Sequence, residues 1–154
     1  MSSAFIKERD GDTFEPLPDR RVSPHPNLVT AEGLAQIEAN LQAVRQRQAD
    51  AQNNDDRPAL AQLEREARYW TQRRASAQTI GGPEKSDEVA FGSTVTIERD
   101  DGRRQTYRIV GEDEADPAQG RLSYVSPVAR ALMGCKVGEV VRAGNSDAEV
   151  IQIS

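Results

Sequence analysis

Two stretches in the first half of the sequence carry apolar residues at the three- and four-residue spacing of a one-sided helix. These apolar seams contain Leu34, Ile37, Leu41 and Val44 in the first stretch, and Leu60, Leu63, Ala67, Trp70 and Ala77 in the second. Between them, residues 53–58 read Asn-Asn-Asp-Asp-Arg-Pro, where Asn and Asp favour a turn and Pro58 suits a helix start. Because the connection is short, the helices should be antiparallel neighbours, each about 30 Å long. The sequence therefore predicts an antiparallel coiled-coil hairpin over residues 28–80.

The segment before the hairpin has a different character. Residues 1–27 show no sustained apolar period and contain four prolines, which disfavour helices and central strands. We therefore predict a flexible or extended N-terminal arm over residues 1–27. Thr30 is placed to cap the first helix, and Glu32 suits the positive end of its dipole.

The second half of the sequence changes to strand periodicity after a linker at residues 81–88. Residues 89–97 and 105–110 are rich in strand-forming residues, and Asp100-Asp-Gly102 between them is a hairpin turn signal. Further strands are predicted at residues 121–125, 140–143 and 149–153, with one short helix over residues 128–133. The expected fold class is α+β, with a small antiparallel sheet covered by that helix over residues 89–154.

Composition excludes several classes of protein. The net charge of −5 argues against binding nucleic acid by bulk charge. A lone cysteine, Cys135, excludes an intramolecular disulfide, and a single histidine, His25, excludes His-rich metal sites. The first residues are too charged for a signal peptide, and no apolar run approaches the ~20 residues of a membrane span. We expect a cytoplasmic protein with no membrane contact and no intrinsic cofactor or metal.

Five segments of the sequence resemble the bacterial transcript-cleavage factors GreA and GreB. They are Leu28-Val-Thr-Ala-Glu-Gly33, Phe91-Gly-Ser-Thr-Val95, Tyr107-Arg-Ile-Val-Gly-Glu-Asp-Glu-Ala-Asp116, and Ser126-Pro-Val-Ala-Arg-Ala-Leu132 followed by Gly138-Glu-Val140. Residues 64–70 also look like the base of the family's second coiled-coil arm. The resemblance covers about residues 28–153 and leaves out the N-terminal arm of residues 1–27.

The resemblance implies an FKBP-like C-terminal domain that docks at the rim of the secondary channel of bacterial RNA polymerase, with the hairpin entering the channel. Ser126 and Pro127 match the segment through which the family contacts the polymerase, and Arg130 lies on the same predicted helix. The implied function is regulation of transcription elongation by a monomer that is not an enzyme. At most, such a protein stimulates the polymerase's own transcript cleavage.

The tip of the predicted hairpin departs from this pattern. In GreA and GreB, a Gly-Asp-x-Ser-Glu-Asn-Ala-Asp/Glu-Tyr segment carries carboxylates that help hold a second Mg²⁺ at the polymerase active centre. The present sequence lacks this segment, and its hairpin is shorter by roughly 18 residues, or on the order of 14 Å in reach. In this respect it is similar to the regulator of nucleoside diphosphate kinase, a Gre relative that resembles the cleavage factors but is thought to bind polymerase without stimulating cleavage. We expect the same behaviour here.

Asp55 and Asp56 are the candidate tip carboxylates for the alternative, a true cleavage-stimulating factor that shares the polymerase Mg²⁺. Adjacent residues on a helix diverge by about 100°, although a turn can bring them together. The simpler interpretation is a solvated turn over residues 53–56 that caps the second helix.

Arginines and acidic residues offer two further candidate sites. Arg65, Arg68, Arg73 and Arg74 follow the second helix and can bind nascent RNA phosphates, or else solubilise a coiled-coil face. Tyr69 and Trp70 are expected to pack at the hairpin base. The acidic segment of residues 112–116 predicts a solvated turn, with a cation or a basic partner as the alternative ligand.

Two other functions compete with the transcription hypothesis. An FKBP-like domain suggests a peptidyl-prolyl isomerase, although the C-terminal half offers only Phe91, Tyr107 and Tyr124 to line an aromatic pocket. A coiled coil also suits a generic adaptor that dimerises through residues 31–80.

Overall fold

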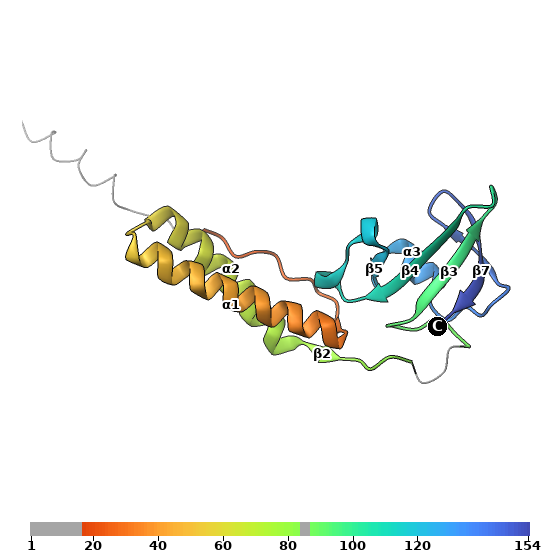
Figure 1. Ribbon diagram of the computed structural model, residues 1–154, viewed down its shortest axis with the longest axis horizontal. Helices are drawn as coiled ribbons and strands as arrows, with labels where there is room; N and C mark the ends of the chain where they lie inside the picture. Colours follow the sequence, from red (N-terminus) through yellow and green to blue (C-terminus); the bar gives the residue numbers. More distant parts are fainter. Residues whose placement is uncertain (1–16, 84–86) are drawn as a thin grey trace, which may run out of the picture.

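The computed structural model describes residues 17–83 and 87–154 (Figure 1). Helices α1 (Ala31–Asn53) and α2 (Arg57–Ser76) run antiparallel and project as a rod from a C-terminal sheet domain. This arrangement confirms the predicted hairpin and the α+β class. Part of the predicted N-terminal arm (residues 1–16) and part of the predicted linker (residues 84–86) lie outside the described residues.

The hairpin forms where the apolar seams predict it. Ile37, Leu41 and Val44 of α1 are buried, and they face the half-buried seam of α2. Thr30 caps α1, because its hydroxyl accepts a hydrogen bond from the Gly33 amide at 3.0 Å. The two helices of 23 and 20 residues therefore bury one stripe each and leave their polar faces in solvent.

A two-stranded parallel pair closes the base of the hairpin. Strand β1 (Leu28–Val29) directly precedes α1, and β2 (Gln78–Thr79) directly follows α2. The Gln78 amide donates to the Asn27 carbonyl at 2.8 Å, and the Ile80 amide donates to the Val29 carbonyl at 3.0 Å. The sequence did not predict this pair, since two-residue strands are too short to show periodicity. The pair holds the segment before α1 next to the segment after α2.

The C-terminal domain is a curled five-stranded sheet in the order β5-β4-β3-β7-β6. Its strands are β3 (Thr94–Arg99), β4 (Arg104–Val110), β5 (Arg121–Ser123), β6 (Val140–Ala143) and β7 (Ser146–Ile153). The β3–β4 hairpin turns at residues 100–102 as predicted. The sheet departs from the predicted antiparallel pattern at β4 and β5, which are parallel. The reason is that the connection over residues 111–120 returns the chain to a position beside Arg108, so β5 runs in the same direction as β4. This connection includes the 3₁₀ turns η2 (Glu112–Glu114) and η3 (Pro117–Gln119).

One helix covers the concave face of this sheet. Helix α3 (Pro127–Leu132) places Ala129 and Leu132 against fully buried Val95, Ile97 and Ile109. Cys135 lies in the same cluster, and burial raises the pKa of its thiol. None of the helices in the described residues is both long and apolar enough to span a bilayer.

Candidate functional site

The hairpin and the sheet domain meet at the carboxylate of Glu114, which is only 5 % exposed. Its Oε2 accepts hydrogen bonds from the Thr30 and Gly111 amides, each at 3.0 Å, and its Oε1 accepts one from the Thr30 hydroxyl. Glu114 thus lies at the N-terminus of α1, where the helix dipole favours negative charge. A residue of the sheet domain therefore completes the cap of a hairpin helix.

Arg73 provides the second buried contact of this junction. It is 2 % exposed; its Nε donates to Asp113 Oδ2 at 2.5 Å and its Nη2 donates to Asn27 Oδ1 at 2.7 Å. Asn27 in turn donates to the Arg73 carbonyl at 2.7 Å. Arg73 thus differs from the expectation that it contacts nascent RNA or solubilises a coiled-coil face, because its side chain is buried and fully engaged at the hairpin base.

The acidic segment of residues 112–116 is therefore not a solvated turn, and that prediction is wrong. Glu114 is buried against the hairpin and the Asp113 side chain is 9 % exposed, and the basic partner of the segment is Arg73 of the same chain. Arg73 also lies 3.9 Å from Glu112. The segment joins the two halves of the molecule through charge-assisted hydrogen bonds.

Tyr69 extends the junction toward the middle of α2. Its hydroxyl donates to Asp113 Oδ1 at 2.5 Å, and its ring meets Trp70 edge-on with centroids 4.9 Å apart. Burial, reinforced by the hydrogen bond to Asp113, raises the pKa of Tyr69 to about 12. Tyr69 and Trp70 pack in the half of α2 nearer the hairpin base, as the sequence predicts.

Two more side chains near the junction, Glu32 and Tyr124, have shifted pKa values. Hydrogen bonding by its own backbone amide and the Thr30 side chain, then the charge of Arg108, lowers the pKa of Glu32. Burial, followed by the nearby Glu112 carboxylate, raises the pKa of Tyr124. The Tyr124 hydroxyl donates to the Pro26 carbonyl, and its ring packs edge-on against buried Phe91. These aromatics are thus engaged in packing rather than arranged around an open proline pocket.

The hairpin tip places Asp55 and Asp56 in different roles. Asp56 caps α2, because its Oδ1 accepts a hydrogen bond from the Ala59 amide at 3.2 Å. Asp55 is in the left-handed backbone region with φ of 50°, and its side chain is 88 % exposed, 3.9 Å from Arg57. Within residues 17–83 and 87–154, no three His, Cys, Asp or Glu side chains form a group that could hold a metal ion.

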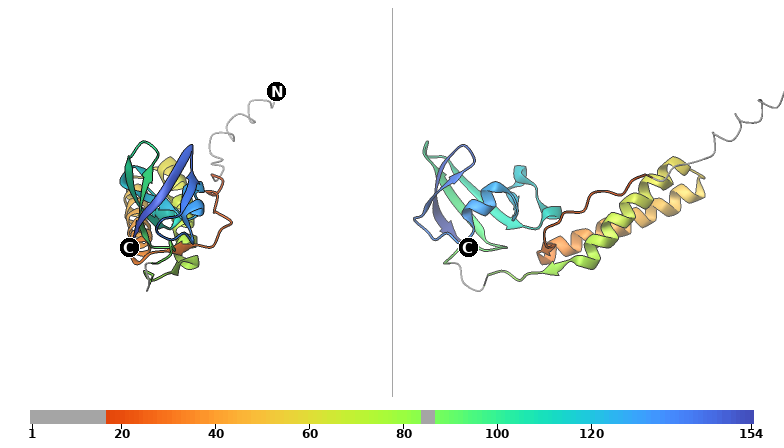
Figure 2. Two further views of the ribbon diagram at one scale, coloured as in Figure 1. Left: turned by 90° about the vertical axis from the view of Figure 1, so that its right-hand side faces the viewer. Right: turned by 180° about the vertical axis from the view of Figure 1, so that it is seen from behind.

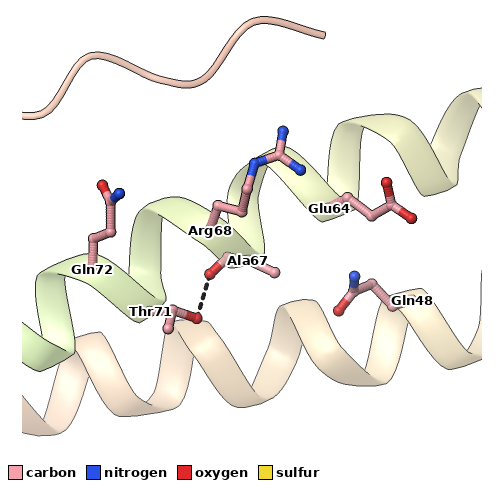
Figure 3. Close-up of a pocket in the computed structure, with 6 residues that line it drawn as sticks. All are labelled: Gln48, Glu64, Ala67, Arg68, Thr71 and Gln72. Atoms are coloured by element: carbon pink, nitrogen blue, oxygen red, sulfur yellow. Dashed lines mark hydrogen bonds between the residues drawn. The ribbon is translucent and has the colours of Figure 1, made fainter. Parts of the chain in front are cut away.

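The remaining arginines of α2 are spread around the helix. Arg68 pairs with Asp19 at 2.6 Å and lines a shallow hollow of about 400 Å³ (Figure 3). Arg74 lies 3.8 Å from Glu38 of α1, and the Nε of half-buried Arg65 has no hydrogen-bond partner among the described atoms. Arg65, Arg68 and Arg74 therefore do not converge on one anion site.

The candidate docking residues lie together at the start of α3. Ser126 caps this helix by accepting from the Ala129 amide at 3.4 Å, and Pro127 is its first residue. Arg130 is exposed one turn further along. The three residues form one small surface on the sheet domain, separate from the hairpin tip.

Comparison with known proteins links both halves of the chain to one family. The family described as "Transcription elongation factor, GreA/GreB, C-term" matches residues 84–154. Transcription elongation factor GreA of Desulfovibrio desulfuricans is 35 % identical over 169 residues, covering 100 % of this chain and 95 % of that relative. Transcription elongation factor GreB of Neisseria meningitidis serogroup B is 37 % identical over 100 residues, covering 61 % of each chain. The match thus spans about three fifths of this GreB relative.

Solved structures are similar at lower identity. GreA factor homolog 1 (Gfh1) of Thermus thermophilus is 19 % identical with a TM-score of 0.42, over 84 % of this chain and 99 % of that one. A GreA/GreB factor from Nitrosomonas europaea is 17 % identical with a TM-score of 0.42, over 82 % and 98 %.

Proposed function

The chain belongs to the GreA/GreB family of transcription elongation factors, and from this premise we propose that it regulates elongation by binding bacterial RNA polymerase at the secondary channel, without strongly stimulating transcript cleavage. In this proposal the sheet domain docks at the channel rim and the hairpin extends inward. The protein acts on the polymerase rather than as an enzyme itself.

One observation carries the proposal: the hairpin projects freely while its base is fixed to the sheet domain. The α1 seam is buried against the half-buried seam of α2, which supports a hairpin that needs no second chain to cover it. The buried contacts of Arg73 and Glu114 orient the rod relative to the sheet domain. A protein built this way can place its tip at a defined distance from its docking surface.

The docking surface proposed on the sheet domain consists of Ser126, Pro127 and Arg130. Pro127 and Arg130 are exposed, and Arg130 can pair with an acidic group on the polymerase. The cap at Ser126 fixes the backbone of this helix start, which preorganises the surface for a rigid partner.

The tip is the basis for proposing weak cleavage. A Mg²⁺ ion at the polymerase active centre lowers the pKa of the attacking water, and added carboxylates help retain it. Here Asp56 uses one carboxylate oxygen to cap α2, so Asp55 is the residue that presents its whole carboxylate to solvent. One such ligand on a short hairpin supports weak assistance at most. Contact between nascent RNA and the exposed Arg68 and Arg74, together with half-buried Arg65, is a further part of the proposal.

Binding is tested first, by immobilising the purified chain and measuring capture of bacterial RNA polymerase core enzyme. We expect the wild-type chain to capture polymerase and the double variant Pro127→Ala plus Arg130→Glu to lose this capture. The control Arg104→Glu, which reverses the charge of an exposed side chain on β4, should retain it. Failure of the wild-type chain to capture polymerase contradicts the proposed function.

Cleavage is tested separately in halted, backtracked elongation complexes. The tip variant Asp55→Ala plus Asp56→Ser keeps a residue that can cap α2, and Asp100→Ala plus Asp101→Ala removes an equivalent exposed pair from the β3–β4 turn. We expect little stimulation by the wild-type chain and the same low rate with both variants. Strong stimulation that only the tip variant abolishes would instead identify a cleavage factor.

A further inference from the structure

Residues 17–27, which we call the strap, lie alongside α2 and end at the hairpin base (Figures 1 and 2). Asp19 accepts a hydrogen bond from Arg68 Nε at 2.6 Å. Arg20 donates to Glu66 at 2.6 Å, and its guanidinium lies 3.7 Å from the centroid of the Tyr69 ring. The strap thus occupies charged and aromatic groups on one side of the hairpin.

The two halves of the strap are attached differently. Asn27 is buried and makes three hydrogen bonds to the Arg73 and Ser76 positions, and the Ser23 hydroxyl donates to Glu112 at 2.9 Å. Residues 23–27 are therefore anchored at the junction. The contacts of Asp19 and Arg20 are half-exposed or exposed ion pairs, which contribute little each. Residues 17–22 can leave α2 while the anchored half stays in place.

One group that the strap covers, the guanidinium of Arg68, suits an acidic partner. The Asp19 carboxylate occupies Arg68 in the same way that a phosphate or an acidic side chain would, since a guanidinium binds both. Arg20 occupies the face of Tyr69, and its guanidinium lies 5.8 Å from the Trp70 ring centroid. Figure 3 shows Arg68 rising from α2 beside the shallow hollow, on the side where the strap passes.

We propose that residues 17–22 form an autoinhibitory strap that covers Arg68 and Tyr69 in the free protein and leaves α2 when the hairpin engages RNA polymerase. This inference rests on the proposed function. Because the strap is tethered, even weak contacts act at a high effective concentration. The observed affinity for polymerase is then reduced by the fraction of molecules in which the face is covered.

The test measures the affinity of the full chain for polymerase core enzyme. The strap variant is Asp19→Asn plus Arg20→Gln, which removes both ion pairs without changing net charge. The matched control is Asp101→Asn plus Arg103→Gln, which removes an exposed ion pair from the β3–β4 turn. Circular dichroism checks that all chains are folded. We expect the strap variant to bind polymerase roughly three- to tenfold more tightly and the control to bind like wild type.

A third variant assigns the gain to the covered face. Adding Arg68→Gln to the strap variant should abolish the gain, because the uncovered arginine is then missing. Equal or weaker binding by the strap variant, with wild type binding normally, overturns the strap proposal alone. If the gain in polymerase affinity persists without Arg68, the gain does not come from uncovering the Arg68 face of α2, and this assignment is overturned. If neither wild type nor any variant binds polymerase, the proposed function fails and the strap proposal fails with it.

Discussion

The carboxylate of Glu114 occupies the space in which a β-carbon of Gly33 would stand. A β-carbon built on Gly33 would lie 2.1 Å from Glu114 Cδ and 2.3 Å from its Oε2. Glu114 needs this position, because it accepts from the Thr30 amide there and closes the N-terminus of α1. A glycine in the first turn of one half of the molecule thus permits the buried acid of the other half.

Replacing Gly33 with alanine should therefore loosen the junction. Either Glu114 or α1 must move, which breaks buried hydrogen bonds to a charged group, so we expect a loss of about 2–3 kcal/mol in the free energy of unfolding. Urea denaturation followed by circular dichroism measures it. Gly81→Ala is the control, since a β-carbon at Gly81 meets nothing within 4 Å. Equal stability of Gly33→Ala and wild type would show that Glu114 is not held as described.

Arg73→Met should destabilise the protein strongly. It leaves Asp113 buried without its cation, and breaking a buried pair in this way costs about 3–5 kcal/mol. Arg74→Met is the neighbouring control, because the exposed pair between Arg74 and Glu38 contributes about 0–1 kcal/mol. Combining Arg73→Met with Asp113→Asn should recover part of the loss in a double-mutant cycle. Strictly additive losses would contradict direct coupling of the two side chains.

The sequence predicted the elements better than the junction between them. Seam spacing located both hairpin helices, and the turn signal at residues 100–102 located the β3–β4 hairpin. These features are local, because helix and turn preferences depend on residues three or four positions apart. The predicted cap at Thr30 is confirmed for the same reason.

The junction was missed because its partners are distant in sequence. Arg73 and Asp113 are separated by 40 residues, and Thr30 and Glu114 by 84. One local signal was present: the α2 seam skips from Trp70 to Ala77, and Arg73 occupies the intervening seam position. A charged residue at a seam position indicates a buried partner, but the sequence alone does not say which acid provides it.

Tyr69 predicts a pH dependence on the alkaline side. Its pKa in the folded protein is raised to about 12 from an ordinary value of 10, so folding favours the protonated phenol. This contribution to stability is complete below pH 10 and is lost as the pH rises toward 12. Tyrosinate absorbance should show a late-titrating group that disappears in Tyr69→Phe. In Asp113→Asn the titration of Tyr69 should move to lower pH, because the carboxylate no longer opposes the phenolate. An unchanged midpoint in Asp113→Asn would contradict that cause.

The tip provides a way to separate structural from chemical roles of its two carboxylates. Asp56→Ala removes the cap of α2 and should cost about 1 kcal/mol of unfolding free energy, whereas Asp56→Ser should retain most of it. Asp55→Gly should stabilise the protein by about 0.5–1 kcal/mol, because glycine adopts the left-handed backbone at Asp55 without strain. Asp55→Ala keeps the strain and serves as the comparison. Denaturant unfolding of the four variants measures these differences. A loss of stability in Asp55→Gly would show that the Asp55 carboxylate has a structural partner at the tip, and would remove it as a free ligand for a metal.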